Sequence, residues 1–162
     1  MAYRVTMIDI REATAADATA AVGLEARLFV EDAGVHDPHA DVTWPSREGS
    51  ADFAALVDGE ESTVLLAWDG EVAVGLLMAY IAASGSTRQP IRSAVLRTMY
   101  VAGSHRRHGV GGALIERFVE WARDAGCAEA HVNHFAANAP AGALYGRHGF
   151  EPRSLERVLS LD

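Results

Sequence analysis

The feature that most constrains the fold is a strand, a glycine-rich turn and an amphipathic helix in direct succession. Residues 93–101 are rich in β-branched and apolar side chains, which favours a strand. Apolar side chains then recur at helical spacing from Val110 to Trp121, and Gly126 is placed to end that helix. Strands that pass directly into amphipathic helices are typical of α/β domains, in which helices cover a central sheet.

The rest of the chain repeats this alternation of strands and helices. Strands are expected at residues 6–11, 62–68, 71–83 and 128–135, and as a pair within 149–161. Helices are expected at residues 14–30, 50–58 and 139–147. Long loops are expected at residues 31–49 and 84–92. The order predicts an α/β fold with a mixed central sheet of about six or seven strands and about four flanking helices.

Composition and charge limit the classes of protein to which the chain can belong. With 162 residues, 49% of them hydrophobic, residues 1–162 are expected to form a single domain with its own core. The net charge of −8 repels phosphate backbones and disfavours a nucleic-acid partner. No apolar run is long enough to span a membrane, and no Cys/His grouping has the spacing of a metal site. The single cysteine, Cys127, cannot form an internal disulfide, which favours a cytoplasmic location.

The turn between strand and helix is suited to holding an anion. Gly109, Gly111 and Gly112 let backbone N–H groups approach a phosphate, and the helix N-terminus adds partial positive charge. Arg106 and Arg107 add formal positive charge beside them. The spacing matches neither the dinucleotide-binding nor the P-loop glycine pattern. On spacing alone, an anion site and a plain turn both stay open.

Residues 138–150 form a second segment whose side chains could take part in catalysis. Asn138 is placed to cap the helix at 139–147, and Gly149 is placed to end it. Tyr145 has two interpretations. It is either an amphipathic filler with a locally bonded hydroxyl, or a proton donor to a leaving group.

Together the two segments resemble a known family. Arg106-x-x-Gly109-x-Gly111 before an apolar helix resembles the acyl-CoA pyrophosphate motif of the GNAT superfamily of N-acetyltransferases. Asn138-x-x-Ala-x-x-Leu-Tyr145 with the following Gly-Phe looks like that family's second signature, and the opening IDIREATAADA resembles its first strand and helix. The resemblance implies that the sheet splays between the strands at 93–101 and 128–135, which opens a slot for acetyl-CoA.

The resemblance also implies roles for individual residues. Backbone groups of Met99 and Val101 would pair with the pantetheine arm, and the Met99 N–H would polarise the acetyl carbonyl. Asn138 would contact the same arm, and Tyr145 would protonate the departing thiolate. The pyrophosphate would lie on a loop formed by Arg106, Arg107, His108, Gly109, Val110, Gly111 and Gly112. The implied mechanism is direct attack by a neutral amine in a ternary complex, with no protein nucleophile.

The chain departs from the family pattern at the general base. Many relatives carry a glutamate on the first splayed strand, whereas residues 93–101 contain no carboxylate. His134 on the facing strand is one candidate, although a histidine hydrogen-bonded in the sheet is an equal alternative. The other candidates precede it in the chain: Glu31, Asp32, His36, Asp37 and Asp41.

The region between the first two helices commonly walls the acceptor site in this family. A cluster of acidic side chains there is either a solvated face or a lip that attracts a cationic amine. The predicted substrate-binding set is Glu31, Asp32, His36, Asp37, Asp41, Trp44 and His134. Trp44 would form a wall of the site or anchor its own loop. On the opposite rim, Arg88 and Arg92 could instead hold an acidic acceptor.

The leading prediction is an acetyl-CoA-dependent N-acetyltransferase that acts on a primary amine of a small cationic molecule. A protein or peptide N-terminal acetyltransferase and a catalytically silent CoA-binding sensor are the alternatives. Sheet edges or the C-terminal strands offer surfaces for a homodimer.

Overall fold

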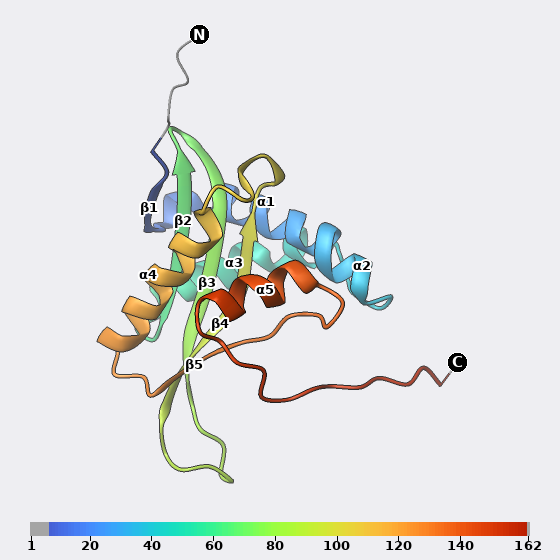
Figure 1. Cartoon of the computed structure of the whole chain (residues 1–162). Coiled ribbons are helices and arrows are strands. Elements are labelled where there is room, and N and C mark those ends of the chain that lie inside the picture. The colour runs from blue at the N-terminus through green and yellow to red at the C-terminus, as the bar shows by residue number, and fades with distance from the viewer. Residues whose placement is uncertain (1–6, 162) are drawn as a thin grey trace.

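A computed structural model describes residues 7–161 and shows one twisted sheet with helices on both faces (Figure 1). Within these residues the strands are β1 (Asp9–Glu12), β2 (Ser62–Asp69), β3 (Val72–Ala83), β4 (Arg92–Val101) and β5 (Glu129–Val132). They follow the order β1-β2-β3-β4-β5. The pairs β1–β2, β2–β3 and β3–β4 are antiparallel, and β5 runs parallel to β4. The predicted mixed α/β architecture is confirmed.

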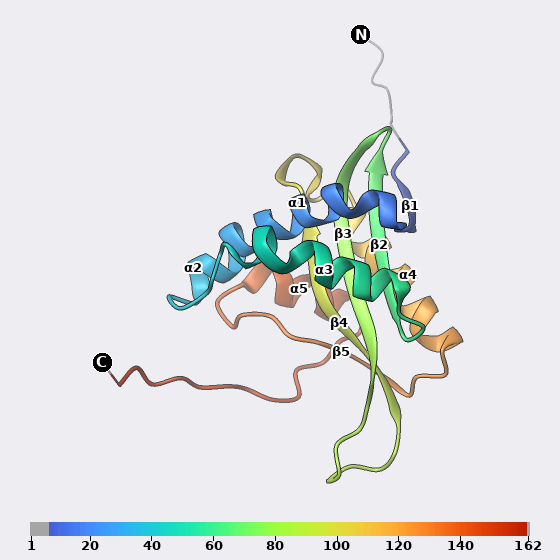
Figure 2. The same ribbon diagram turned by 180° about the vertical axis from the view of Figure 1, so that it is seen from behind.

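The helices divide between the two faces of the sheet. They are α1 (Ala18–Leu28), which continues as a π-helix at Phe29–Ala33, then α2 (Gly34–His36), α3 (Trp44–Asp58), α4 (Val110–Asp124) and α5 (Ala139–Arg147). α4 and α5 lie on the face seen in Figure 1, and α1 and α3 lie on the face seen in Figure 2. No helix within residues 7–161 is long and apolar enough to cross a membrane.

The core lies where the β2–β3 hairpin meets the helices. Leu76 and Leu77 on β3 are fully buried on opposite faces of the sheet, as alternating side chains of a two-sided sheet must be. On α4, Leu114 and Phe118 are also fully buried, which confirms the apolar stripe predicted for that helix. The hairpin turns at Gly70, whose φ of +61° is a conformation that glycine adopts without strain.

The predicted loop at residues 31–49 is wrong over most of its length. The first helix does not stop near Val30 but continues through the π-helix and α2 to His36. The next helix starts at Trp44 rather than near residue 50, with Pro45 in its first turn. Proline is favoured there because the first-turn N–H groups have no intrahelical partner. Only residues 37–43 are left as a connection.

The predicted sheet of six or seven strands is also wrong, because the described part of the chain forms five. The strand pair expected within 149–161 is absent from the described residues, which run as an exposed extended segment. Pro152 lacks a backbone N–H, and no described strand pairs with residues 153–161. The strand expected at 128–135 is limited to β5, and the strand expected at 6–11 is observed from Asp9, with Thr6 outside the described residues.

Candidate active site

The edge of β4 that faces β5 is only partly covered. The β4–β5 ladder pairs Ser93–Leu96 with Glu129–Val132, whereas β4 itself continues to Val101. The Ala102 N–H donates to the Val74 oxygen of β3 at 2.8 Å. Backbone groups alternate in direction along a strand, so those of Met99 and Val101 point away from β3, toward the uncovered edge. The two strands therefore part after Leu96 and expose backbone donors and acceptors.

The loop after β4 presents the N-terminus of α4 beside this edge. Gly109 precedes the helix with a φ of +84°, and Ala113 is the first residue whose N–H bonds back to the Gly109 oxygen. The preceding N–H groups of Val110, Gly111 and Gly112 thus lack intrahelical partners, as the first turn of any helix does. An anion fits this arrangement, because the helix end supplies both donors and partial positive charge.

Close packing also requires two of these glycines. A Cβ atom at Gly111 would lie 3.2 Å from Leu144 Cδ2 of α5, and one at Gly112 would lie 3.0 Å from His148 Nε2. The helix N-terminus therefore packs tightly against α5 and its cap, and a larger side chain at either glycine would have to displace Leu144 or His148. Arg107 and His108 are exposed on the same loop, while the Val110 side chain is buried in the core.

Arg106, whose side chain is 48% exposed, contacts Glu31 of the π-helix and the end of β4. Its Nη2 pairs with Glu31 Oε2 at 2.5 Å, its Nε donates to the Val101 oxygen at 2.8 Å, and the Tyr100 hydroxyl donates to Glu31 Oε1 at 2.8 Å. The hydrogen bonds from Arg106 and then Tyr100 hold the pKa of Glu31 below its ordinary value. Glu31 is predicted to bind substrate and Arg106 to bind cofactor, but in the structure the two side chains pair with each other.

Tyr145 lies at the inner end of the site. Its ring stacks on His134 with centroids 5.9 Å apart and meets Phe150 edge-on at 5.8 Å. Only 7% of its surface is exposed, and burial, with a further contribution from the Asp32 charge, raises its pKa to about 12. The phenol is therefore protonated at neutral pH, and no described residue hydrogen-bonds its oxygen.

Asn138 joins α5 to the π-helix at Phe29–Ala33. Its Oδ1 accepts the Ala141 N–H at 3.1 Å, which confirms the predicted helix cap, and its Nδ2 donates to Asp32 Oδ1 at 2.8 Å. The same Asp32 oxygen lies 3.4 Å from His36 Nε2. The Asn138 side chain is thus engaged within the protein, and Asp32 links it to His36.

The remaining members of the predicted acceptor set have local partners. Asp37 accepts the His39 N–H at 2.9 Å, and Asp41 accepts hydrogen bonds from Thr43 and pairs with Arg47. Trp44 stacks on Phe29 with centroids 5.7 Å apart. His134 donates from Nδ1 to the Phe135 oxygen at 2.9 Å. Of the acidic residues predicted to attract the acceptor, Asp37 and Asp41 therefore form turns, whereas Asp32 contacts Asn138 and His36.

A sequence profile described as the acetyltransferase (GNAT) family matches residues 27–150. The chain belongs to this family. It is 33% identical over 152 residues to the aminoglycoside N(6')-acetyltransferase type 1 of Stenotrophomonas maltophilia, covering 93% of this chain and 89% of that protein. Its fold is similar to that of a mutant of the BH1408 protein from Bacillus halodurans (TM-score 0.86, 21% identity, 94% and 99% of the chains). It is also similar to the aminoglycoside N-acetyltransferase AAC(6')-Iy in complex with CoA (TM-score 0.75, 22% identity, 100% and 98%).

The GNAT protein is an N-acetyltransferase, and its acetyl donor is acetyl-CoA. The residues present fit that donor: the uncovered edge of β4 offers backbone partners, and the packed glycine turn offers N–H groups for a pyrophosphate. Within residues 7–161 no group of three metal-ligating side chains is placed to hold a metal ion.

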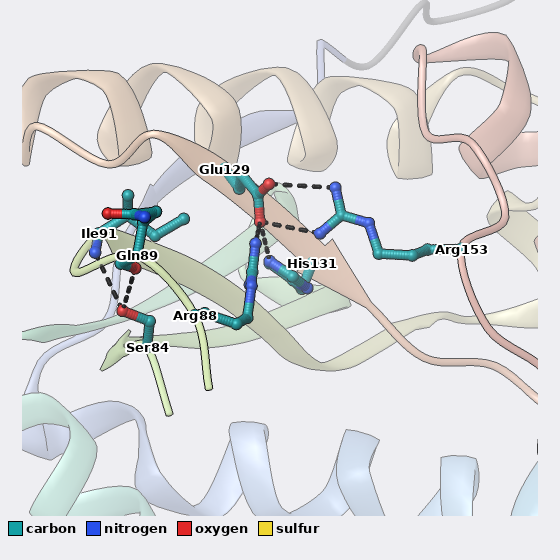
Figure 3. Close-up of polar contacts among 7 residues, drawn as sticks. All are labelled: Ser84, Arg88, Gln89, Ile91, Glu129, His131 and Arg153. Atoms are coloured by element: carbon teal, nitrogen blue, oxygen red, sulfur yellow. Dashed lines mark hydrogen bonds and ion pairs between the residues drawn. The ribbon is translucent and has the colours of Figure 1, made fainter. Parts of the chain in front are cut away.

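The acetyltransferase also contains an ion cluster around Glu129 that sequence analysis missed (Figure 3). Arg88 donates to Glu129 Oε2 at 2.8 Å, Arg153 contacts both carboxylate oxygens at 2.9 and 3.0 Å, and His131 Nε2 lies at 2.9 Å. These partners, Arg153 first, hold the pKa of Glu129 far below its ordinary value. Arg92 pairs with Glu61 at 2.8 Å. Both arginines predicted to hold an acidic acceptor thus already have carboxylate partners.

A second missed cluster lies between α1, α3 and β4. Arg97 makes two hydrogen bonds to Asp52, at 3.0 and 2.5 Å, and its Nη2 lies 3.8 Å from Glu25 Oε1. Glu25 is 1% exposed, and its Oε2 has no hydrogen-bond partner in the described structure. Burial raises the pKa of Glu25, and the Arg97 charge opposes this rise. The signal available in the sequence was an arginine within the apolar strand at residues 93–101.

Proposed function

We propose that the protein acetylates a primary amine of a small cationic molecule of the aminoglycoside kind, by direct attack in a ternary complex. The observation that carries the proposal is the Asp32 carboxylate, which accepts a 2.8 Å hydrogen bond from Asn138 at the start of α5 and whose charge helps to raise the pKa of Tyr145. A fixed carboxylate at this point attracts a cationic amine toward the reacting centre. The name of the Stenotrophomonas relative supports this acceptor class.

The proposed donor site uses the uncovered backbone and the α4 N-terminus. Met99 and Val101 would pair with the pantetheine arm along the β4 edge, for which the Arg106 side chain has to release the Val101 oxygen. The pyrophosphate would lie on the N–H groups of Val110, Gly111 and Gly112, with Arg107 and His108 exposed beside them. Bound there, acetyl-CoA supplies an acetyl group activated as a thioester.

Two groups of the protein would act on the reacting atoms. The Met99 N–H points toward the uncovered edge and would donate a hydrogen bond to the developing oxyanion. Tyr145 keeps its proton at neutral pH and would donate it to the departing sulfur. No step needs a protein nucleophile, and the free cysteine, Cys127, packs at the margin of the core.

The experiment that tests the proposal measures release of the CoA thiol by the purified protein across a panel of amines. The panel contains aminoglycosides, polyamines, amino acids and short peptides. Turnover confined to polycationic small molecules supports the proposal. Turnover with peptides alone supports the N-terminal acetyltransferase, and binding of acetyl-CoA without turnover supports the sensor. Absence of acetyl-CoA binding contradicts the proposed donor site.

We also propose that the chain acts in the cytoplasm, as one domain, and as a homodimer. The segment after Arg153 exposes apolar side chains, among them Val158 at 87% and Leu159 at 81%. A cavity of about 660 Å³ is lined by β5, which is the edge strand of the described sheet, and by the start of this segment at Arg153 and Ser154. An edge strand beside an exposed apolar segment invites pairing with a second copy. Light scattering on the full chain and on Leu159→Glu tests this, since the proposed dimer dissociates in the variant.

A further inference from the structure

The acceptor amine must lose a proton before it can attack, because an ammonium nitrogen has no free electron pair. Several candidate bases already bind other groups in the structure. Glu31 accepts from Tyr100 and Arg106, while Asp37 and Asp41 hold turns of the connection before α3. His134 Nδ1 donates to the Phe135 oxygen, and the other ring nitrogen lies against α5, since a Cβ atom at Gly142 would be 3.3 Å from His134 Nε2. This leaves Asp32 and His36.

Asp32 and His36 lie one helical turn apart, and both contact the segment that joins β5 to α5. The His36 Nε2 is 3.4 Å from Asp32 Oδ1, and the two side chains are 22% and 24% exposed. The imidazole packs against Phe135 with ring centroids 5.3 Å apart, which limits its rotation. Asn138 fixes the carboxylate from the other side through its 2.8 Å hydrogen bond. Both side chains are thus oriented yet reachable by an acceptor.

The chemistry of the pair assigns a tautomer to the imidazole. An ionised carboxylate only accepts hydrogen bonds, so the ring nitrogen facing Asp32 carries the hydrogen. The electron pair then lies on Nδ1, which no described residue hydrogen-bonds. We infer that His36, oriented by Asp32, is the general base that takes the proton of the acceptor ammonium group. This inference rests on the proposed function, because His36 would deprotonate the acceptor amine proposed there.

The proton balance is simple. One proton leaves the ammonium nitrogen for Nδ1 of His36, which gives a neutral amine and an imidazolium 3.4 Å from the Asp32 carboxylate. Asp32 on the π-helix is the titratable group at ion-pair distance from His36. Phe135, which packs on the imidazole, follows His134, whose ring stacks on Tyr145. Because the Asp32 charge raises the pKa of Tyr145, the carboxylate that orients the base also helps to keep the acid protonated.

The kinetic test compares His36→Gln with His39→Gln, a matched change at an exposed histidine three residues away. We expect His36→Gln to lower kcat about 100-fold near neutral pH, a typical contribution of one general base. The acetyl-CoA Kd should stay within about twofold, and the loss should shrink at high pH, where the amine is already neutral. The His39→Gln variant should match the wild type. A kcat within about threefold of wild type, or a change confined to KM, overturns the inference.

The second test needs no turnover and so separates this inference from the proposed function. Nitrogen-15 NMR of the folded protein, without donor or acceptor, reports which nitrogen of His36 carries the hydrogen. We expect the Nε2-protonated tautomer in the wild type and a loss of this preference in Asp32→Asn. An Nδ1-protonated wild type overturns the assignment even if the amine panel succeeds. A silent panel with the expected tautomer instead counts against the acceptor class and leaves the oriented base supported.

Discussion

The two flanks of β4 show how one strand serves both stability and binding. Toward β3 the ladder runs from Arg92 to Val101, with one irregularity beside Met78. Toward β5 it stops at Leu96. The closed flank satisfies its backbone groups internally and lies against the buried core. The open flank leaves the same kinds of group for a ligand. The proposed binding site therefore lies where β4 has no neighbouring strand beyond Leu96, on the side opposite β3.

The closed flank should respond most strongly to loss of core volume. Leu76→Ala removes a fully buried side chain of β3 and leaves a cavity, so we expect the free energy of unfolding to fall by about 2–5 kcal/mol. Denaturant unfolding measures this. Leu155→Ala, at a position 64% exposed, is the control and should change little. Equal effects of the two changes would mean that the core is not centred on this flank.

The open flank should lose its ligand when charge enters the glycine turn. In Gly111→Glu the new side chain meets Leu144 and brings negative charge to the α4 N-terminus, so we expect the acetyl-CoA Kd to rise at least about 100-fold. Isothermal titration measures the Kd. Gly146→Glu adds the same charge on α5, where nothing lies within 4 Å, and should bind nearly as the wild type does. Tight binding by the Gly111 variant would contradict the pyrophosphate site.

Removing the Tyr145 hydroxyl should affect chemistry at the open flank without affecting binding. We expect Tyr145→Phe to lower kcat about 10- to 100-fold while the acetyl-CoA Kd stays unchanged, because the ring is kept and only the proton donor is lost. Tyr80→Phe, on the β3 side and 36% exposed, is the matched control. Unchanged kcat in the Tyr145 variant would remove its role as an acid.

The smallest effect should come from the buried carboxylate behind β4. Because the pKa of Glu25 is raised from 4.5, the folded state holds its proton more tightly, and stability falls as pH rises above that ordinary value. Glu25→Gln has no proton to lose. We expect the Tm of this variant near pH 7 to exceed that of the wild type by roughly 2–4 °C, equivalent to about 1 kcal/mol. The two Tm values should converge at about pH 3.5, where the carboxyl is protonated in both the folded and the unfolded state. A lower Tm at pH 7 would show that Arg97 stabilises the charge more than burial penalises it.

The sequence predicts the closed flank better than the open one for a physical reason. The β2–β3 hairpin, α4 and the Asn138 cap of α5 rest on local patterns that tertiary structure reinforces. Pro45 lies within the predicted loop but stands in the first turn of α3, where proline is favoured although it breaks a helix interior. Apolar residues do follow Pro152, but a strand forms only where a neighbour accepts its hydrogen bonds.

The candidate site was predicted as a set of residues but not as an arrangement. The family motifs place Asn138 and Tyr145 in the site, and charge places Asp32 and His36 near it. The hydrogen bond between Asp32 and Asn138 joins positions 106 residues apart, which no local pattern encodes. Likewise, the pairing of Arg106 with Glu31 joins two groups that the linear sequence assigns to different ligands.

The π-helix at Phe29–Ala33 has a consequence for how acceptor preference can change. A π turn holds about one residue more than an α turn, because its hydrogen bonds join residues five apart rather than four. Deleting one residue there would restore α geometry and rotate the rest of the helix by about 100° around its axis. His36, which follows the π-helix, would then point to another side of the helix axis, while α4 and its glycine turn stay untouched. A single in-frame deletion would thus redirect the proposed base without changing the proposed donor site.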